Sequence, residues 1–273
     1  MKRAIFTIFS LLLTFGTLNA DDLKPFANLK GTLNIAGGTA HIASEKEAIK
    51  DIMRKYPDIS ITIAGGGTGV GIKQVSEGLV DIANAGRAPT ENELKSGDLK
   101  SHLFALDGIV IIVNKNLNIS NLTTQNLIDI FTGKTTSFSD FGASGGKINL
   151  YIRDASSATM EVFSKQGING AKISKDAKVV PSNAAMKTAI FSDKNGIGFV
   201  SFGTVDKSVK TLCIDDRCPS KEAILNDEYH IYRGLYAVTK NSPKPLALEF
   251  INYLKSDSGA KILTSQGLIP YQK

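Results

Sequence analysis

The stretch ISITIAGGGTGVGI, residues 59–72, joins a strand pattern to a glycine-rich loop and the start of a helix. Apolar and polar residues alternate over 59–64, which predicts a half-buried β-strand. Helical spacing over 71–77 predicts a helix after the loop, and 80–84 again has strand character. A strand, a loop, a helix and a further strand in this order indicate an α/β fold with a largely parallel sheet.

The rest of the chain continues this alternation. Further strands are predicted at 32–36, 108–114, 147–153, 196–201 and 231–239, and further helices at 44–55, 123–131, 245–255 and 258–266. The run at 108–114 (GIVIIVN) is continuously apolar, which is typical of a strand buried on both faces. No segment recurs with a period of about 20 to 50 residues, so solenoids and propellers are excluded.

The N-terminus predicts export. Lys2 and Arg3 precede an apolar run at 4–18, and a small residue, Ala20, ends the segment. This pattern is typical of a signal peptide, here 1–20, and the apolar run is shorter than the roughly 20 residues of a spanning helix. Removing the signal peptide reduces the net charge from +6 to +4. The chain as a whole has an ordinary globular composition, with 42% hydrophobic and 21% charged residues. We therefore expect a soluble periplasmic protein, neither disordered nor collagenous.

The only two cysteines, Cys213 and Cys218, agree with export. An even count in an exported chain favours a disulfide, here one that closes a short loop. Two free thiols, redox chemistry and metal binding are the alternatives. Metal binding is disfavoured because His41, His102 and His230 are scattered along the chain.

Three junctions between a strand and a helix combine glycine or serine with threonine, at 37–39 (GGT), 66–69 (GGTG) and 156–159 (SSAT). The free N–H groups and the dipole at a helix start favour an anion, and the hydroxyls add donors. Arg87 and Arg153 lie near two of these junctions. Together these groups predict a site for a tetrahedral oxyanion, although a single junction could equally be a tight turn.

Competing activities lack their signatures. The dinucleotide fingerprint fails because Val70 stands where a glycine is needed, and a P-loop fails at Ile128. The nucleophile elbow G-x-S-x-G is absent. His41 could act as a base beside Thr39, but a lone histidine at a helix start more often lies on the surface or caps the helix. The basic residues are dispersed and tryptophan is absent, so no nucleic-acid partner is expected.

Nine segments in this order resemble the periplasmic phosphate-binding proteins of PstS type. They are 35–39 (IAGGT), 65–72 (GGGTGVGI), 81–87 (DIANAGR), 107–110 (DGIV), 121–123 (NLT), 129–134 (DIFTGK), 153–159 (RDASSAT), 196–201 (GIGFVS) and 232–236 (YRGLY). The resemblance covers most of residues 30–270. IFTGK followed by R-x-x-x-S-x-T is its most specific part.

The resemblance implies a two-lobed periplasmic binding protein fold of type II, each lobe a mixed, mostly parallel sheet flanked by helices. One lobe would combine 23–110 with 233–273, and the other would hold 111–232. Such a protein captures inorganic phosphate in the cleft and delivers it to an ABC transporter permease. We expect a monomer that is not an enzyme and needs no cofactor. Another oxyanion, such as sulfate, molybdate or tungstate, and an exported phosphatase are the alternatives.

The same resemblance supplies the expected ligand-binding residues. They are Gly38, Thr39, Thr68, Gly69, Arg87, Asp107, Arg153, Ser157, Ala158 and Thr159. Ala158 stands where the family usually has glycine, and its backbone N–H can still donate. Arg87 stands where some members carry an Asp that accepts the proton of hydrogen phosphate. Arg87 is thus either a ligand or the partner of Glu91 or Glu93, and the acceptor is Asp107, Asp154 or absent.

Overall fold

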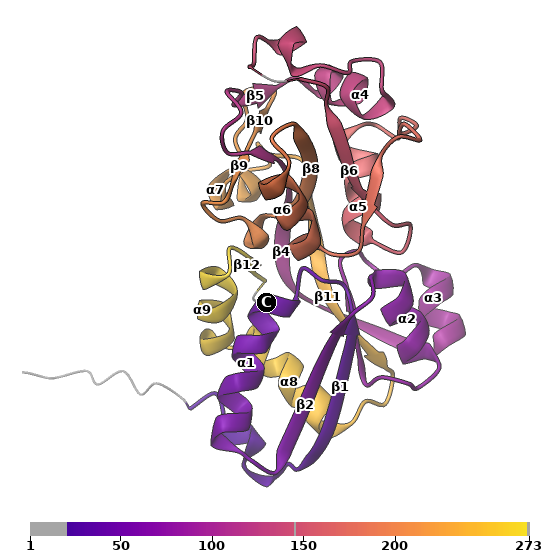
Figure 1. Ribbon diagram of the computed structural model, residues 1–273. Helices are drawn as coiled ribbons and strands as arrows, with labels where there is room; N and C mark the ends of the chain where they lie inside the picture. The colour runs from indigo at the N-terminus through magenta and orange to yellow at the C-terminus, as the bar shows by residue number, and fades with distance from the viewer. Residues whose placement is uncertain (1–20, 145, 272–273) are drawn as a thin grey trace, which may run out of the picture.

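The computed structural model describes residues 21–144 and 146–271, and its chain folds into two lobes (Figure 1). The predicted signal peptide, 1–20, lies outside the described residues. Two long strands, β4 (Leu99–Asn114) and β11 (Tyr232–Lys240), lie between the lobes. This architecture confirms the two-lobed α/β fold that the resemblance implied.

The sheet of the first lobe is built on β1 (Gly31–Gly37). It pairs in parallel with β2 (Ile59–Gly65) and with β3 (Ile82–Ala85). Strand β11 then runs antiparallel between β3 and β4, and the short β12 (Ile269–Pro270) pairs with β4. Because β1, β2 and β3 are parallel, their carboxyl ends meet at one edge, which faces the second lobe (Figure 1).

The crossing strand β4 changes its partner halfway along its length. It pairs with β11 up to Gly108 and with β8 (Gly196–Ser201) from Ile109 onward. The sequence predicted a strand only over 108–114, so the observed strand begins nine residues earlier. Its first half escaped prediction because exposed and buried residues mix there, whereas the second half is buried throughout.

The second lobe continues the sheet through β8, β6 (Asn149–Arg153) and β7 (Lys178–Val180), which are mutually parallel in that order. Strand β9 (Val209–Thr211) also pairs with β4. A separate two-stranded ladder joins β5 (Asn121–Leu122) to β10 (Cys213–Ile214). Cys213 of β10 forms a disulfide with Cys218, as the sequence predicted.

Helices cover both faces of each sheet. Those of the first lobe are α1 (Ile42–Lys55), α2 (Thr68–Ser76), α3 (Glu91–Gly97), α8 (Pro245–Lys255) and α9 (Asp257–Ser265), with the 3-10 turn η1 (Lys24–Asn28). Those of the second lobe are α4 (Thr124–Thr132), α5 (Ala158–Val162), α6 (Asn183–Ser192) and α7 (Lys221–Leu225), with the short turns η2 (Phe138–Phe141), η3 (Phe163–Gly167) and η4 (Phe202–Thr204). In Figure 1, α1, α8 and α9 lie on one side of the first sheet and α2 and α3 on the other.

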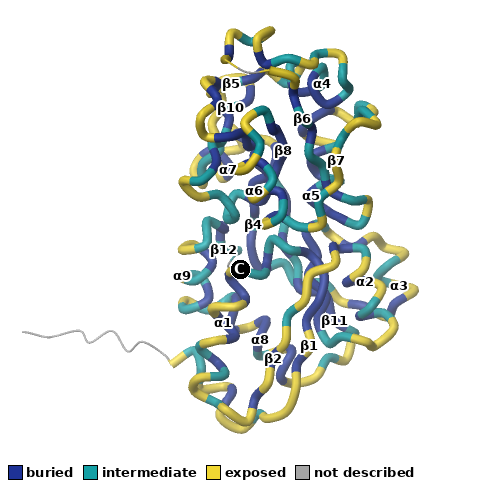
Figure 2. Tube along the Cα trace, viewed as in Figure 1, coloured by how far each residue is buried: buried dark blue, intermediate teal, exposed yellow. Residues whose placement is uncertain are grey.

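The buried apolar side chains form one main cluster in each lobe. One gathers residues of 109–231 together with Ile269. The other contains Phe26 and Phe250 with side chains of α1, α8 and α9, and a smaller cluster lies under α2 and α3. Figure 2 shows buried backbone along the central strands and exposed backbone at the outer loops. Each lobe therefore has a core of its own, and the space where the lobes meet stays free for polar groups.

Helix α2 begins three residues before the predicted 71–77 because the glycine turn is tight enough to start the helix at Thr68. Gly71 lies inside this helix, where a Cβ atom would come within 2.8 Å of the Ala36 carbonyl oxygen and the Gly37 Cα. Glycine at this position lets α2 pack directly on β1. The close packing holds the start of α2 beside the end of β1.

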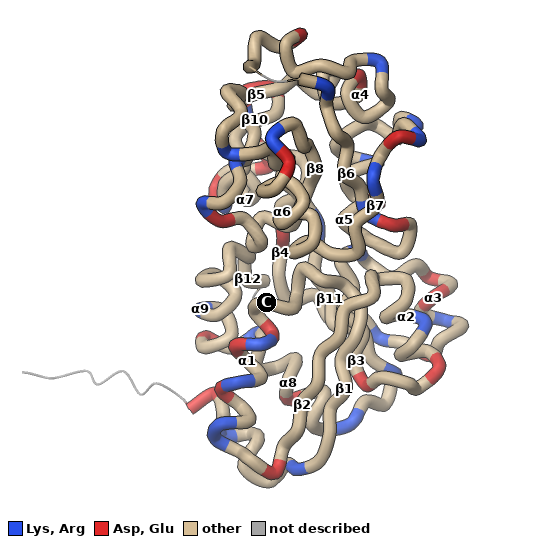
Figure 3. Tube along the Cα trace, viewed as in Figure 1, with Lys and Arg blue, Asp and Glu red and all other residues tan. Residues whose placement is uncertain are grey.

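Charged residues of both signs are interspersed over the two lobes (Figure 3). In the part of the chain that the structure describes, no helix combines the length and the apolar character needed to cross a membrane. The same residues hold no cluster of three or more His, Cys, Asp or Glu side chains that could bind a metal ion. Overall charge therefore does not mark a binding surface, and the site has to be located from local geometry.

Candidate anion-binding site

A small cavity lies where the two lobes meet. It is lined by the ends of β1 and β3, the start of α2, the turn from β6 into α5 and the start of β11: Gly38, Thr39, Ala40, His41, Gly67, Thr68, Gly86, Arg153, Ser157, Ala158, Thr159 and Arg233. The centre of a water-sized sphere has about 10 Å³ in which to move. That is close to the space of one enclosed water molecule. The cavity is therefore small, and it excludes an extended ligand.

The turn from β2 into α2 brings the second lobe against the first. Gly66 and Gly67 have φ of 145° and 89°, and a Cβ atom on Gly67 would lie 2.4 Å from the Ser156 Oγ. The Ser156 hydroxyl donates to the Gly66 carbonyl at 3.1 Å, and the Ser156 backbone carbonyl accepts the Gly69 N–H at 3.2 Å. The Gly69 N–H is thus already bonded, and Gly69 does not line the cavity, whereas Thr68 does.

The two threonine hydroxyls of the first lobe are oriented by N–H donors. Thr39 Oγ1 accepts from the backbone N–H and the side-chain Nδ2 of Asn183, each at 3.3 Å. Thr68 Oγ1 accepts from the Gly86 N–H at 3.0 Å. A hydroxyl that accepts a hydrogen bond still has its own O–H to donate. Both threonines are therefore set to donate toward the cavity.

The second lobe contributes two further hydroxyls that accept a hydrogen bond and keep their own O–H free to donate. Ser157 is the N-cap of α5, and its Oγ accepts the Met160 N–H at 3.4 Å. Thr159 Oγ1 accepts from Nη1 of Arg233 at 2.9 Å. Between them, the N–H of Ala158 opens α5 and has no acceptor within the helix. The turn thus presents two hydroxyls and one backbone N–H to the cavity.

Arg153, at the end of β6, is buried with one donor unused. Its Nε and Nη2 donate to the carbonyls of Val180 and Pro181 at 3.0 and 2.9 Å, which fixes the plane of the guanidinium. Its Nη1 is buried and has no hydrogen-bond partner among the described residues. Burial lowers the pKa of Arg153 while Asp154 opposes the change, yet an arginine stays charged in proteins. A fixed positive charge with a free donor therefore lines the cavity.

Arg233 also lines the cavity, although it was not among the predicted ligands. It lies directly across from Asp107 in the β4–β11 ladder, and its Nε and Nη2 donate to Asp107 Oδ2 at 3.0 and 2.8 Å. Asp107 Oδ1 accepts from the Ser201 hydroxyl at 2.7 Å. Burial raises the pKa of Asp107, and Arg233 and Ser201 limit the rise by stabilising the carboxylate. Both oxygens of Asp107 are thus engaged, and its role in the structure is to position Arg233.

The arginine could have been found from the sequence only with the strand pairing in hand. Tyr232-Arg233-Gly234 is part of the resemblance, but nothing in the segment itself places it opposite Asp107. Once β4 and β11 are paired, an opposite-charge pair on facing strands is an ordinary stabilising arrangement. The pairing register of β4 and β11 therefore shows that Arg233 lies opposite Asp107, which the motif alone does not show.

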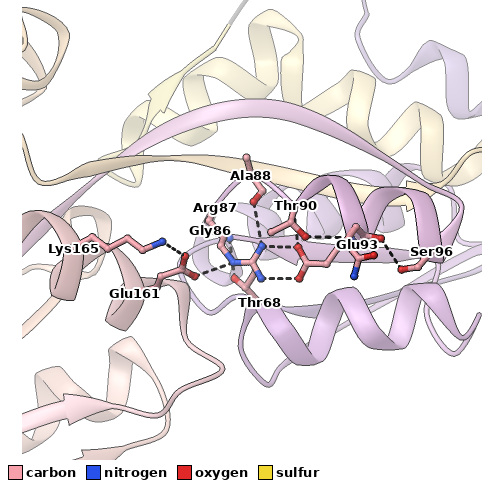
Figure 4. Close-up of polar contacts among 10 residues, drawn as sticks. Thr68, Gly86, Arg87, Ala88, Thr90, Glu93, Ser96, Glu161 and Lys165 are labelled. Carbon is pink, nitrogen blue, oxygen red and sulfur yellow. Dashed lines mark hydrogen bonds and ion pairs between the residues drawn. The ribbon is translucent and has the colours of Figure 1, made fainter. Parts of the chain in front are cut away.

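Arg87 follows Gly86, which lines the cavity, but does not line it itself. Figure 4 shows its polar contacts. Its Nη1 and Nη2 donate to the two carboxylate oxygens of Glu93 at 2.8 and 2.7 Å, and its Nε lies 2.9 Å from Glu161. Hydrogen bonding to Arg87 lowers the pKa of Glu93 to about 2. Of the two possibilities in the sequence, the structure has the ion pair, with Glu93 and not Glu91. Because Glu161 belongs to α5, Arg87 also links the two lobes.

His41 differs from both expectations for it, since it is fully buried and its side chain caps no N–H of α1. Burial, with a contribution from the positive charge of Arg233, lowers the pKa of His41 to about 3, so the ring is neutral. One turn further on, the buried Glu45 accepts from Asn84 Nδ2 at 2.5 Å. Burial raises the pKa of Glu45 to about 8. A neutral, buried polar layer thus lies next to the cavity.

The structure gathers most of the predicted ligands around one cavity. Those that line it are Gly38, Thr39, Thr68, Arg153, Ser157, Ala158 and Thr159, and those that do not are Gly69, Arg87 and Asp107. Asp154 does not line the cavity either. Its Oδ1 accepts instead from the Ser156 N–H at 2.9 Å. Neither of the two candidate carboxylate acceptors therefore lines the cavity.

Comparisons with known proteins place this architecture in a family. A family model for the PBP superfamily domain matches residues 26–258. The phosphate-binding protein PstS of Bacillus subtilis (strain 168) is 34% identical over 256 residues, which span 92% of this chain and 85% of that protein. Among solved structures, a protein of Clostridium perfringens with bound phosphate, described as a phosphate ABC transporter substrate-binding protein, superposes with a TM-score of 0.83 at 29% identity. The match covers 89% of this chain and 100% of the Clostridium perfringens chain.

A second solved structure agrees with the first. An ABC-type phosphate transport receptor from Vibrio cholerae matches with a TM-score of 0.70 and 29% identity, over 87% of this chain and 99% of its own. The chain therefore belongs to the PBP superfamily and, within it, to the PstS-type phosphate-binding proteins.

Proposed function

We propose that this chain captures inorganic phosphate in the cavity between its lobes and delivers it to an ABC transporter. The observation that carries the proposal is the buried Nη1 of Arg153, charged and without a partner among the described residues. Four hydroxyls that are free to donate surround the same small space. The phosphate-binding relatives, and the neighbour solved with phosphate, support phosphate as the anion.

The proposed ligands replace the water that phosphate loses on entering the cavity. They are the backbone or side-chain donors of Gly38, Thr39, Thr68, Arg153, Ser157, Ala158 and Thr159, to which we add Arg233. Hydrogen bonds from charged or oriented donors to an anion are short and strong. Asp154 compensates the charge of Arg153 only in part, since it lies 3.9 Å from Nη2 and its side chain is 40% exposed. Arg87, Asp107 and Gly69 would act from outside by holding these groups in place.

Capture would involve closure of the lobes without covalent chemistry. Several contacts already cross between the lobes, including Ser156 with Gly66 and Asn183 with Thr39. A bound anion would add further bonds to both sides and so stabilise the closed form. We therefore propose a binding protein that is not an enzyme, and no hydrolysis of a chromogenic phosphate ester is expected.

We propose further that the mature chain starts near residue 21 and acts in the periplasm as a monomer that docks on a permease. The lobes would consist of 23–110 with 233–273 and of 111–232. The separate apolar clusters support this division, because one of them is drawn almost entirely from 109–231. Docking on a permease is an inference from the family and needs both lobes intact.

Isothermal titration calorimetry of the chain from residue 21 onward tests the proposal. Phosphate is expected to bind at one site, and Arg153→Gln should weaken binding by about a hundredfold, because a buried charged donor to an anion is lost. Arg54→Gln is the matched control, since Arg54 is 74% exposed on α1 and should leave binding unchanged. Absence of binding heat with the unsubstituted chain would refute phosphate capture.

A second candidate ligand is a fully ionised oxyanion such as sulfate. The observation that favours it is the absence of any carboxylate from the described residues that line the cavity. Donors alone suit an anion that has no proton of its own to place. Competition of sulfate, molybdate and tungstate against phosphate in the same titration separates these ligands.

A further inference from the structure

Hydrogen phosphate and sulfate differ by one proton, and the site has to place it. The protonated oxygen of hydrogen phosphate is a donor, and a buried donor without an acceptor weakens binding. The described lining residues include no carboxylate, and their hydroxyls already accept hydrogen bonds from the protein. Arg153 and Arg233 can only donate. Each hydroxyl keeps at most one lone pair while it also donates toward the anion, so an acceptor that makes no bond with the protein is better placed to receive the proton of hydrogen phosphate.

Among the side chains of the described lining, His41 is the one with an acceptor whose polar atoms make no hydrogen bond with the protein. It is 0% exposed, and neither ring nitrogen has a hydrogen-bond partner among the described residues. Phe104 packs against the ring at 5.5 Å between centroids, which helps to hold it in place. A Cβ atom on Gly38 would lie 3.2 Å from the ring Nδ1 and Cε1. Glycine at position 38 thus leaves room for the His41 ring next to the cavity.

The surroundings of His41 determine where its ring carries its proton. Burial and the nearby Arg233 keep the ring neutral, so that one nitrogen bears a proton and the other a lone pair. The backbone carbonyls of Gly38, Ala85 and Tyr236 lie close enough to the ring to favour a proton on its nitrogens. A carbonyl can only accept, so the ring nitrogen nearest to one carries the proton. The other nitrogen keeps its lone pair.

We propose that His41 determines specificity: its unprotonated ring nitrogen accepts a hydrogen bond from the protonated oxygen of hydrogen phosphate. Sulfate would place a lone pair against that nitrogen, and the carbonyls oppose the switch of tautomer that would relieve the repulsion. The inference rests on the proposed capture of phosphate. It assigns to a neutral imidazole the acceptor role expected of Asp107 or Asp154, neither of which lines the cavity.

Nitrogen NMR of the unsubstituted chain tests the proposal directly, because the chain has only three histidines. With ¹⁵N-histidine labelling, saturating phosphate or arsenate is expected to move the unprotonated nitrogen of His41 toward the frequency of a protonated one. Sulfate should cause no such movement. His102 and His230 lie outside the cavity lining and act as internal references. A His41 signal that ignores phosphate, or that responds equally to sulfate, would overturn the proposal.

Substitutions provide the second test. His41→Leu removes the acceptor and should lower the ratio of phosphate to sulfate affinity by about tenfold or more, the effect of one lost hydrogen bond to a charged ligand. His41→Asn and His41→Gln place an oxygen acceptor near one or the other ring nitrogen, and one of them should recover part of the ratio. His230→Gln, at an exposed position, is the control. An unchanged ratio in folded His41→Leu would refute the assignment.

The outcomes distinguish this inference from the proposed function. If the unsubstituted chain does not bind phosphate, phosphate capture fails and the role of His41 fails with it. If the chain binds phosphate while the His41 signal and the affinity ratio stay constant, only the role of His41 fails. Should His41→Leu not fold, the NMR experiment decides without it.

Discussion

Replacing Glu45 by Gln is expected to stabilise the protein at neutral and alkaline pH and to leave its stability in acid unchanged. Glu45 is fully buried in α1, and burial raises the pKa of its carboxyl from the ordinary value of 4.5 to about 8. Its Oε1 and the Oδ1 of Asn84 lack partners among the described residues. Gln has the shape of the protonated acid, and its amide can both accept from and donate to Asn84.

The expected size follows from the two pKa values. Between 4.5 and about 8 the folded chain keeps a proton that the unfolded chain has released, so the free energy of unfolding falls as the pH rises. At about 1.4 kcal/mol per pKa unit, the full effect is about 5 kcal/mol, of which about 3 kcal/mol is lost by pH 7. The contribution of Glu45 is complete below pH 4.5 and is lost as the pH approaches 8.

Urea denaturation at intervals between pH 5 and pH 8, followed by circular dichroism, measures the effect. The anion must be dialysed away first, because a ligand that binds only the folded state adds its own stabilisation. His41 contributes in the opposite sense: burial lowers its pKa from 6.5 to about 3, so its contribution is lost as the pH falls from 6.5 toward 3. Both proteins share His41, so its contribution cancels when the two curves are subtracted.

The difference between Glu45→Gln and the unsubstituted chain should grow steadily with pH. Glu47→Gln is the matched control, since it removes a carboxylate from the exposed side of the same helix, where the side chain is 52% exposed. The control should change stability by less than about 0.5 kcal/mol at every pH. A constant difference for Glu45→Gln from pH 5 to pH 8 would show that the buried carboxyl is not held protonated.

Three further changes test other parts of the structure. Glu161→Gln removes the link from Arg87 to the second lobe. Because this ion pair is partly exposed, the change should weaken phosphate binding by about two- to threefold at low salt and by less at high salt. Equal effects at both salt concentrations in calorimetry would contradict this. Asp107→Asn leaves the guanidinium of Arg233 buried without its carboxylate and should cost about 3 kcal/mol in urea denaturation, whereas a loss below about 1 kcal/mol would argue against the pair. Cys213→Ser opens the disulfide and should cost about 2 kcal/mol, an effect that a reducing agent should reproduce in the unsubstituted chain and not in the variant.

The parts of the fold that the sequence predicted are those with strong local signals. Periodicity located the strands and helices, as at 59–64, and glycine with threonine located the turns around the cavity. The long strand β4 was only half predicted, because its first half lies at a partly exposed surface and its alternation is irregular. Two-lobed organisation came from the resemblance, since composition and periodicity alone allowed one domain or two.

The candidate site was predicted unevenly for a physical reason. Thr68 and Ser157 lie at helix starts, and a helix start is a local feature that a single segment reveals. Arg233 pairs with Asp107 and His41 packs on Phe104, both on a distant strand, so their own segments carry no sign that they line the cavity. Arg87 shows the reverse case: a promising position beside a junction, whose side chain turns to Glu93 and away from the cavity.

The change of partner along β4 has a mechanical consequence. Its ladder with β11 ends at Gly108 and its ladder with β8 begins at Ile109, so the two ladders meet at this one step of the strand. The second crossing lies alongside, because the Ile109 N–H donates to the Ile231 carbonyl at 2.7 Å just before β11. A twist of both crossings can therefore move the lobes apart while most of each ladder stays whole. We therefore expect the work of opening to depend on the few polar contacts across the cleft, such as Ser156 with Gly66, rather than on the sheets. The two adjacent crossings, at Gly108 and at Tyr232, would thus serve together as the pivot of the molecule.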